Sequence, residues 1–356
     1  MEIASRTRQL IADLSGRLIS APFTPLTGSG ELSPDDLERY VAALVPAVDG
    51  VCVWAHTGRG LHLPAAVRSR VLSAFRAATT GPVLAAVGPP VATVRHGATD
   101  RHAATGRPGA PGQQRAAGDF DEQLSASLRL AEQAAAGGAD GLMAYPVPAL
   151  SDPQTRVRRT LALHDSLAGA TGLPVIGFLL YPGAGGVAYD PALLTELAAR
   201  PHIAGVKLAT LDDAAACRTA IDAVHAGGAL AITGEDIMYG ASLSWGADAA
   251  LVGIAAAAAR LSAIPLRAWF AGDTAAFGAA SAVLDRFAAT VFRPPVDGYV
   301  QRMLWVAERE GLIPGRAAHD PYGVPLHPDE RAEVFAAYDA ARARVQVGHP
   351  NAPLLS

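Results

Sequence analysis

The feature that most constrains this fold is a series of eight short apolar segments between residues 17 and 254, separated by patterns typical of helices. Most are continuous apolar runs without alternation, as expected for strands buried on both faces. They cover residues 17–23, 50–55, 82–88, 140–145, 174–181, 203–207, 229–233 and 248–254. Eight strands alternating with helices predict an α/β fold, a (β/α)8 TIM barrel, with a doubly wound open sheet as the alternative.

The turns around these segments support the same fold. Proline stands at or near the start of three predicted helices, as Pro34, Pro64 and Pro191. This is the helix position that tolerates proline best. Three of the turns that lead into predicted strands share an aspartate, namely Asp49, Asp140 and Asp248. Short glycine-containing turns of this kind are expected where a helix ends and the next strand begins.

The repeat divides the chain into two parts. We expect residues 1–262 to form the barrel, with an insertion at about 89–118, and residues 263–356 to form an appended C-terminal helical region. The insertion is rich in Gly, Arg, Pro and Ala, which predicts a flexible surface loop. The alternative is a mobile lid, because loops after barrel strands lie on the catalytic face. The C-terminal region is expected to pack on the barrel or on a neighbouring subunit.

Composition narrows the functional classes. A net charge of −4 gives no basic footprint for nucleic acid or an anionic membrane. Cys52 and Cys217 are too few for a disulfide framework, and the ten histidines form no metal-binding motif. The first 17 residues lack the apolar core of a signal peptide, and the most apolar stretch, 249–259, is too short to cross a bilayer. We therefore expect a cytoplasmic protein without a metal.

One residue stands apart from the rest of the chain. Lys207 is the single lysine among 29 Lys and Arg residues. Arginine can serve most roles of a cation, but only lysine can lose its proton in a buried site and attack a carbonyl as an amine. Lys207 closes the apolar segment 203–207, so we expect it at the carboxyl end of the sixth strand. The alternative is an ordinary buried or ion-paired lysine.

Other polar residues follow predicted strands at the same end of the barrel. They are His56, Thr57, Gly58 and Arg59 after the second strand, Tyr181 at the end of the fifth, and Thr233, Gly234, Glu235 and Asp236 at the seventh. In a barrel these residues surround one pocket. An amine, a phenol, a hydroxyl and two carboxylates suit an amine that attacks a keto group while a tyrosine moves protons.

The order and spacing of these motifs resemble the pyruvate-dependent class I aldolases typified by dihydrodipicolinate synthase and N-acetylneuraminate lyase. The resemblance runs from about Leu18 to about Pro325. The segment 21–25, Ala-Pro-Phe-Thr-Pro, is similar to the first strand of that family and the loop after it. Residues 56–58 fall where the family has a Thr-Thr-Gly-Glu turn, and residues 233–236 resemble its Ser/Thr-Gly-Asp-Asp motif.

The resemblance implies catalytic roles for three residues. Lys207 forms an imine with the keto carbon of pyruvate or another 2-keto acid, Tyr181 passes protons, and Thr57 adds a hydroxyl to that relay. Substrate contacts are expected from His56, Gly58, Arg59 and Gly234. The backbone N–H groups of the turn at 56–58 would hold the substrate carboxylate. For Arg59 a structural ion pair is the alternative role, and Glu235 and Asp236 are expected to cap the next helix.

The sequence also departs from the family pattern. Arg59 replaces a glutamate, the loop 182–186 carries no cation, and Tyr145 stands early in place of a Tyr-Tyr pair that completes the relay across a subunit interface. We therefore predict a Schiff-base-forming lyase acting on pyruvate or another 2-keto acid, other than dihydrodipicolinate synthase itself. A keto-acid-sugar dehydratase and a non-catalytic keto-acid-binding member are the alternatives. Because the imine is the electron sink, no cofactor is expected. The expected partners are a keto acid, with or without an aldehyde, and further copies of the chain in a homotetramer or homodimer.

Overall fold

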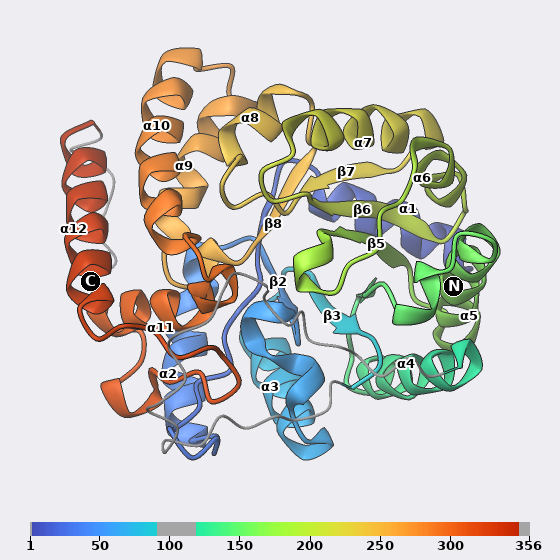
Figure 1. Ribbon diagram of the computed structural model, residues 1–356, viewed down its shortest axis with the longest axis horizontal. Helices are drawn as coiled ribbons and strands as arrows, with labels where there is room; N and C mark the ends of the chain where they lie inside the picture. Colours follow the sequence, from blue (N-terminus) through green and yellow to red (C-terminus); the bar gives the residue numbers. More distant parts are fainter. Residues whose placement is uncertain (1, 91–118, 349–356) are drawn as a thin grey trace, which may run out of the picture.

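The computed structural model describes residues 2–90 and 119–348, and its centre is a closed barrel of eight parallel strands (Figure 1). The strands are β1 (Leu18–Ser20), β2 (Gly50–Val53), β3 (Val83–Val87), β4 (Gly141–Ala144), β5 (Val175–Leu180), β6 (Ile203–Ala209), β7 (Leu230–Thr233) and β8 (Ala249–Val252). Each strand pairs with the next, and β1 also pairs with β8. The predicted barrel is confirmed, and the open sheet is excluded.

Helices surround the strands, and three of them begin at or beside the prolines that the sequence singled out. The surrounding helices are α1 (Ile3–Leu14), α2 (Pro34–Leu44), α3 (Ala65–Ala78), α4 (Phe120–Ala136), α5 (Arg156–Thr171), α6 (Pro191–Ala198), α7 (Ala214–Gly227) and α8 (Tyr239–Ser244). Two of the proline starts carry a side-chain cap. Ser33 accepts a hydrogen bond from the N–H of Asp36, and Asp190 accepts one from that of Leu193. Such caps satisfy N–H groups that have no partner within the helix.

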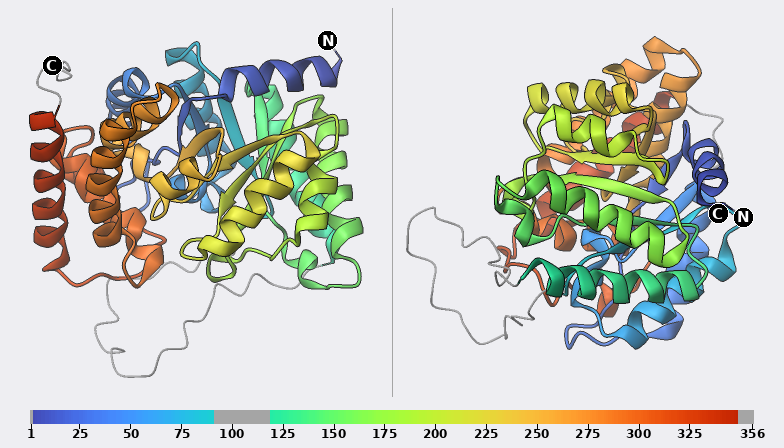
Figure 2. Two further views of the ribbon diagram at one scale, coloured as in Figure 1. Left: turned by 90° about the horizontal axis from the view of Figure 1, so that it is seen from above. Right: turned by 90° about the vertical axis from the view of Figure 1, so that its right-hand side faces the viewer.

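The recurring aspartates of the turns fasten neighbouring strands together. They are Asp49, Asp140 and Asp248. The Oδ2 atom of Asp140 accepts a hydrogen bond from the N–H of Val83 at 2.8 Å, and the N–H of Asp140 donates to the carbonyl of Val83 at 2.8 Å. The other two aspartates form the same reciprocal pair with Leu18 and Ala231. Each aspartate thus joins its own strand to the preceding one at the end where the strands begin, and α1 lies across that end (Figure 2).

The strands are apolar and buried throughout, with one charged exception. Lys207 is the only charged residue in the eight strands. The prediction that it closes the sixth strand was wrong by two residues, because β6 continues to Ala209. Leu208 and Ala209 are apolar and pair with β7 and β5, so the ladder extends past the lysine.

The C-terminal region consists of α9 (Ala259–Phe270), α10 (Thr274–Val291), α11 (Tyr299–Arg309) and α12 (Glu330–Gly348). Figure 1 shows α10, α11 and α12 together on one side of the barrel, with α12 outermost. The division expected at residues 262 and 263 falls within α9. Residues 91–118, nearly all of the predicted insertion, lie outside the described residues.

A buried arginine holds this region in place. Arg302 of α11 has no exposed surface, and its Nη1 donates to the carbonyls of Val291 and Arg293 at 2.9 and 2.8 Å. Its Nε donates to Glu330 at 2.8 Å. Arg302 therefore joins the end of α10 and the start of α12 to α11. In doing so it fixes the connection 292–298 that reaches over the barrel.

No single helix within residues 2–90 and 119–348 has both the length and the apolar character needed to cross a membrane. Among these residues, one pair of consecutive helical segments, Thr274–Val291 and Val296–Arg309, meets both criteria when taken together. The chain bends by 110° between the two segments.

Candidate active site

A small cavity of about 50 Å³ opens at the carboxyl ends of the strands. Its polar lining residues are His56, Thr57, Tyr181, Lys207, Glu235, Asp236 and Tyr299. Two aromatic rings, those of Phe178 and Phe292, add apolar walls. The lining comes from loops or strand ends of β2, β5, β6, β7 and β8 and from the C-terminal region. This is the end of a (β/α)8 barrel at which active sites are built.

Lys207 lies in this cavity without an ionic partner. Only 7% of it is exposed, and its Nζ lies 4.6 Å from the ring centroid of Phe178. Within residues 2–90 and 119–348, no carboxylate lies within the 4.0 Å of Nζ that defines an ion pair. Burial lowers the pKa of Lys207, and the attraction of Asp236 offsets only part of this effect. A lowered pKa raises the fraction of neutral amine, which is the nucleophilic form.

Two glycines make room for the side chains of the cavity. A Cβ at Gly234, just after β7, would overlap the Cε of Lys207. A Cβ at Gly253, just after β8, would lie 2.8 Å from Thr57 Oγ1 and 3.1 Å from a ring carbon of Tyr299. The absence of a side chain at Gly234 therefore gives the lysine its path into the cavity.

Three side chains form a hydrogen-bonded series beside the lysine. The Tyr299 hydroxyl lies 3.0 Å from Thr57 Oγ1 and 3.0 Å from His56 Nδ1. The Tyr299 ring stacks on Phe292, with centroids 4.7 Å apart, and on His56, with centroids 5.7 Å apart. Burial holds the pKa of Tyr299 well above its ordinary value, so the phenol keeps its proton at neutral pH.

Tyr181 follows β5 and lines the same cavity. Burial raises the pKa of its phenol to about 12, with a further contribution from the carboxylates of Asp297 and Asp236. The side chain is therefore a neutral phenol at pH 7, able to donate a hydrogen bond to a reacting oxygen or accept one from it.

Arg59 lies behind His56, outside the lining of the cavity. Only 3% of it is exposed, and its guanidinium binds Asp297 at 2.9 and 3.0 Å and Asp320 at 2.6 and 3.1 Å. The remaining N–H faces His56 Nε2 at 3.2 Å. Of the two roles open to Arg59, this geometry favours the structural ion pair, because two carboxylates bind the guanidinium and Arg59 does not line the cavity.

The loops around the cavity contain residues with an uncommon backbone conformation, a positive φ angle. Three residues other than glycine have positive φ angles among the described residues: Trp54 at 61°, Arg59 at 53° and Leu211 at 71°. The first two flank the turn at 56–58 and the third lines the cavity. Each such residue costs about 1–3 kcal/mol, and residues of this kind cluster at functional sites. Arg59 retains this conformation while bound by two aspartates.

In the turn at 56–58, one of the three backbone N–H groups is already bound within the protein. The N–H of Gly58 donates to the carbonyl of Ala55 at 3.0 Å, so it is not free for a ligand. A Cβ at Gly58 would lie 2.7 Å from the carbonyl of Pro22, which requires glycine at this position. Within this turn, the N–H groups of His56 and Thr57 have no backbone acceptor among the described residues.

The expectation that Glu235 and Asp236 cap the next helix was wrong. Glu235 instead accepts hydrogen bonds from the N–H and hydroxyl of Thr210 and from the N–H of Leu211. Asp236 accepts one from the N–H of Ile254 at 2.7 Å. The two carboxylates therefore fasten the loops of the neighbouring strands, β6 and β8. Burial raises the pKa of Asp236 to about 6.

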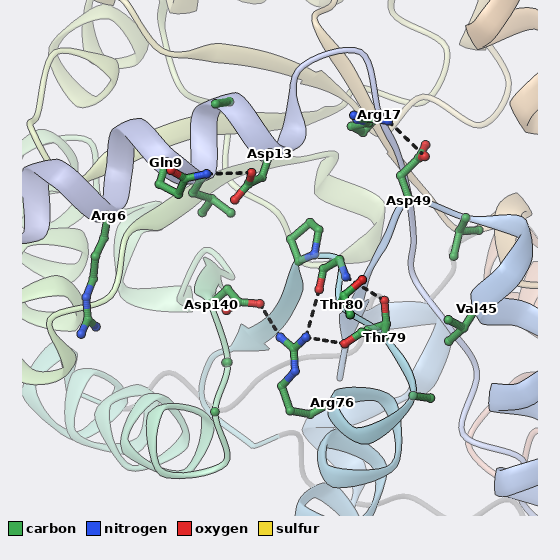
Figure 3. A pocket seen from close by; sticks show the side chains of 18 of the residues that line it. Arg6, Gln9, Asp13, Arg17, Val45, Asp49, Arg76, Thr79, Thr80 and Asp140 are labelled. Carbon is green, nitrogen blue, oxygen red and sulfur yellow. Dashed lines mark hydrogen bonds and ion pairs between the residues drawn. The ribbon is translucent and has the colours of Figure 1, made fainter. Parts of the chain in front are cut away.

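A much larger hollow, of about 1090 Å³, lies at the opposite end of the barrel (Figure 3). Its charged groups bind one another, the backbone or, for Asp13, the side-chain amide of Gln9. Arg76 donates to Asp140 at 2.6 Å, and Arg17 lies 3.6 Å from Asp49. Both aspartates also fasten strands, so these groups have structural roles. No three His, Cys, Asp or Glu side chains within the described ranges are grouped to hold a metal ion.

The sequence matches the model of the dihydrodipicolinate synthetase family over residues 121–341. This chain belongs to the dihydrodipicolinate synthetase family. It is 28% identical to 4-hydroxy-tetrahydrodipicolinate synthase 1 of Streptomyces coelicolor over 193 residues, which is 54% of this chain. That match spans about half, 52%, of the curated relative.

Solved structures agree with this dihydrodipicolinate synthetase family fold. YagE of E. coli K12, solved in complex with pyruvate, has a TM-score of 0.71 at 21% identity, with 92% of this chain and 98% of that chain covered. The sialic acid aldolase of Ruminococcus gnavus has a TM-score of 0.71 at 17% identity, with the same coverage. At this identity the likeness concerns the fold. Membership of the family supports an enzyme at a coarse level.

The structure brings together most of the residues singled out in the sequence of this dihydrodipicolinate synthetase family member. Those lining the cavity are Lys207, Tyr181, Thr57, His56 and Gly234, whereas Gly58 and Arg59 lie behind it. Sequence reasoning missed Tyr299 and the aspartates that bind Arg59. The available signal was the helix break at Pro294 and Pro295, which is followed at once by Asp297 and Tyr299.

Proposed function

We propose that this protein is a lyase that forms an imine between Lys207 and a 2-keto acid, with pyruvate as the simplest candidate. The observation that carries the proposal is the amine of Lys207, which is buried without an ion pair among the described residues, in a cavity that the hydroxyls of Thr57, Tyr181 and Tyr299 also line. Family membership supports the same chemistry. The name of the Streptomyces relative and the pyruvate complex of YagE agree with a keto-acid substrate.

The chemistry follows from the nucleophile. The neutral amine of Lys207 attacks the keto carbon, and a proton moves from nitrogen to oxygen to give a carbinolamine. The carbinolamine hydroxyl takes up a proton and leaves as water, so that the C=N bond of the iminium forms. Loss of a proton from the adjacent carbon gives an enamine that adds to an aldehyde. The reverse sequence cleaves an aldol, and water releases the keto acid from the iminium.

The neighbouring side chains are proposed to transfer protons and to bind the substrate carboxylate. Tyr181 is proposed to move protons at the reacting oxygen, because its phenol is neutral and lines the same cavity. Thr57 is proposed to join that relay. The N–H groups of His56 and Thr57 are proposed to bind the substrate carboxylate. Because the bonds of Arg59 are taken by Asp297 and Asp320, we assign it a structural role.

In dihydrodipicolinate formation, a cation of the enzyme binds the carboxylate of the second substrate. We propose that the second substrate of this protein lacks that carboxylate. The loop at 182–186 carries no cation, and Asp297 and Asp320 bind the guanidinium of Arg59. We therefore propose a reaction other than the formation of dihydrodipicolinate. The identity of the aldehyde is a question for a substrate panel, after imine formation has been tested.

Borohydride trapping with pyruvate tests the proposal. Reduction of the imine leaves a stable adduct, which intact mass and peptide mapping locate. With one lysine in the chain, an adduct on the peptide containing Lys207 is the expected result. No adduct with pyruvate or a panel of longer keto acids, combined with thermal stabilisation by one of them, would favour the non-catalytic alternative.

A further inference from the structure

The proposed chemistry needs a group that both gives and takes a proton. The carbinolamine hydroxyl must receive a proton in order to leave as water, and the water that later releases the keto acid must lose one. A side chain that serves both steps has to return to its first state within one turnover. A phenol with a strongly raised pKa cannot do so alone, since it does not give up its proton for long.

Tyr299 connects two other side chains of the cavity, Thr57 and His56. It is the first residue of α11 and only 6% exposed. Its hydroxyl lies at hydrogen-bond distance, 3.0 Å, from both Thr57 Oγ1 and His56 Nδ1. The stacked rings of Phe292 and His56 hold the phenol between its two partners. One hydroxyl with a neighbour on each side can accept a proton from one and pass its own to the other.

We propose that Thr57, Tyr299 and His56 form a proton relay contained in one chain, with its central hydroxyl supplied by the C-terminal region. This inference rests on the imine chemistry proposed above. Thr57 is the member that meets the substrate, and Tyr299 acts through it. The Tyr-Tyr pair that the family resemblance leads one to expect is missing from the sequence, and Tyr299 is a phenol of the same chain within reach of Thr57.

His56 can serve as the proton store at the far end of the relay. Its Nε2 lies 3.2 Å from the Oδ1 of Asp297 and the same distance from the Nη1 of Arg59. With Nε2–H donating to Asp297, Nδ1 is left to carry or lack a proton. Hydrogen bonding to His56 and the charge of Arg59 outweigh burial and lower the pKa of Asp297, which keeps this carboxylate an acceptor.

Protons balance over a turnover. In the forward step His56 Nδ1–H passes its proton to Tyr299, Tyr299 passes its own to Thr57, and Thr57 passes its own to the carbinolamine hydroxyl, which leaves as water. His56 then remains neutral, with Nε2–H still bound to Asp297. When water attacks the iminium, each proton moves one place back and His56 Nδ1 regains its proton. No oxidant, reductant or further reactant is needed.

The rate of imine formation tests the relay without knowledge of the aldehyde. Wild-type protein and Tyr299→Phe are mixed with pyruvate, quenched with borohydride at successive times, and read by intact mass. We expect Tyr299→Phe to form the adduct roughly 10²–10⁴-fold more slowly, the range for a lost acid or base group, and to reach the same final extent. Tyr322→Phe is the matched control, because Tyr322 is also 6% exposed but stacks on His62 outside the cavity.

Two further variants separate a relay from a packing role. Thr57→Val combined with Tyr299→Phe should be no slower than the slower single variant, because either change breaks the same relay. Multiplied defects would overturn the proposal. His56→Asn should also slow adduct formation, since an amide can hold the Tyr299 hydroxyl but cannot store a proton. This variant tests the relay even if Tyr299→Phe fails to fold.

The outcomes distinguish this inference from the function on which it rests. If wild-type protein forms no adduct with any keto acid, both proposals fall. If the wild type forms an adduct on Lys207 and Tyr299→Phe forms it at an equal rate, the relay alone is overturned.

Discussion

Both ends of the barrel carry a hollow lined by charged side chains, and the two differ in what those charges bind. Where the strands begin, Asp49 and Asp140 each bind a backbone N–H of the preceding strand and lie beside an arginine. Where the strands end, Lys207 is buried and has no ion pair among the described residues. The first hollow has about twenty times the volume of the second.

The comparison teaches that volume is a poor guide to chemistry in this molecule. Paired charges are at their energetic minimum and offer little to a ligand. An unpaired amine in a small apolar space has a lowered pKa and a strong tendency to react. The predictions below test this contrast, and they run from the largest expected effect to the smallest.

Lys207→Arg should abolish adduct formation with pyruvate. Arginine keeps the positive charge but cannot form an imine, because its guanidinium does not lose a proton near neutral pH. Intact mass after borohydride treatment measures the loss, and Arg76→Met at the other end of the barrel is the control that should trap normally. Turnover that persisted in Lys207→Arg would end the Schiff-base proposal.

Tyr181→Phe should slow turnover or adduct formation by roughly 10²–10⁴-fold, the usual contribution of a positioned acid or base. The phenol is expected to act on the reacting oxygen, so the affinity for the keto acid should change less than the rate. Borohydride quenching at successive times, over a range of pyruvate concentrations, separates the affinity from the rate. A rate equal to that of the wild type would remove Tyr181 from the mechanism.

Arg59→Met should lower the free energy of unfolding by about 3–5 kcal/mol, because it leaves buried Asp320 without its partner. Arg76→Met removes a partly exposed pair with Asp140 and should cost no more than about 1 kcal/mol. Urea unfolding of the two variants measures the difference. If Arg59→Met weakened pyruvate binding and left stability unchanged, Arg59 would be a substrate ligand after all.

Asp236→Asn should shift the pH dependence of adduct formation toward lower pH. The neutral amine is the attacking form, so the rate rises with pH until Lys207 has lost its proton. Burial lowers the pKa of Lys207 below 10.5, and the negative charge of Asp236 opposes that shift. Removing the charge therefore lowers the pKa further. A rise that moved to higher pH, or not at all, would contradict an electrostatic link between the two residues.

The sequence predicted those features that depend on local pattern. Continuous apolar runs located all eight strands, and the single lysine located the centre of the cavity. Local reasoning failed for Glu235 and Asp236, because a rule about the following helix ignores the loops of adjacent strands that compete for the same carboxylates. Local reasoning also placed the end of β6 two residues early, because it took the charged Lys207 as the end of the apolar segment.

The remaining parts of the site depend on how distant segments dock. Tyr299 meets Thr57 across 242 positions, and Arg59 meets Asp297 and Asp320 across 238 and 261. No periodicity or motif near any of these residues indicates its partner. The contacts follow from the buried Arg302 and the apolar faces of α10 and α11, which set where the connection 292–298 lies above the barrel.

The docking of that connection limits how this molecule can be divided by protein engineers. A truncation after β8 would retain every strand together with Lys207, Tyr181 and Thr57. It would also expose the guanidinium of Arg59, leave Thr57 and His56 without their shared phenol, and open the apolar wall at Phe292 to water. The eight-stranded unit is thus not a portable module, and a chimaera built on it must carry residues 292–320 along.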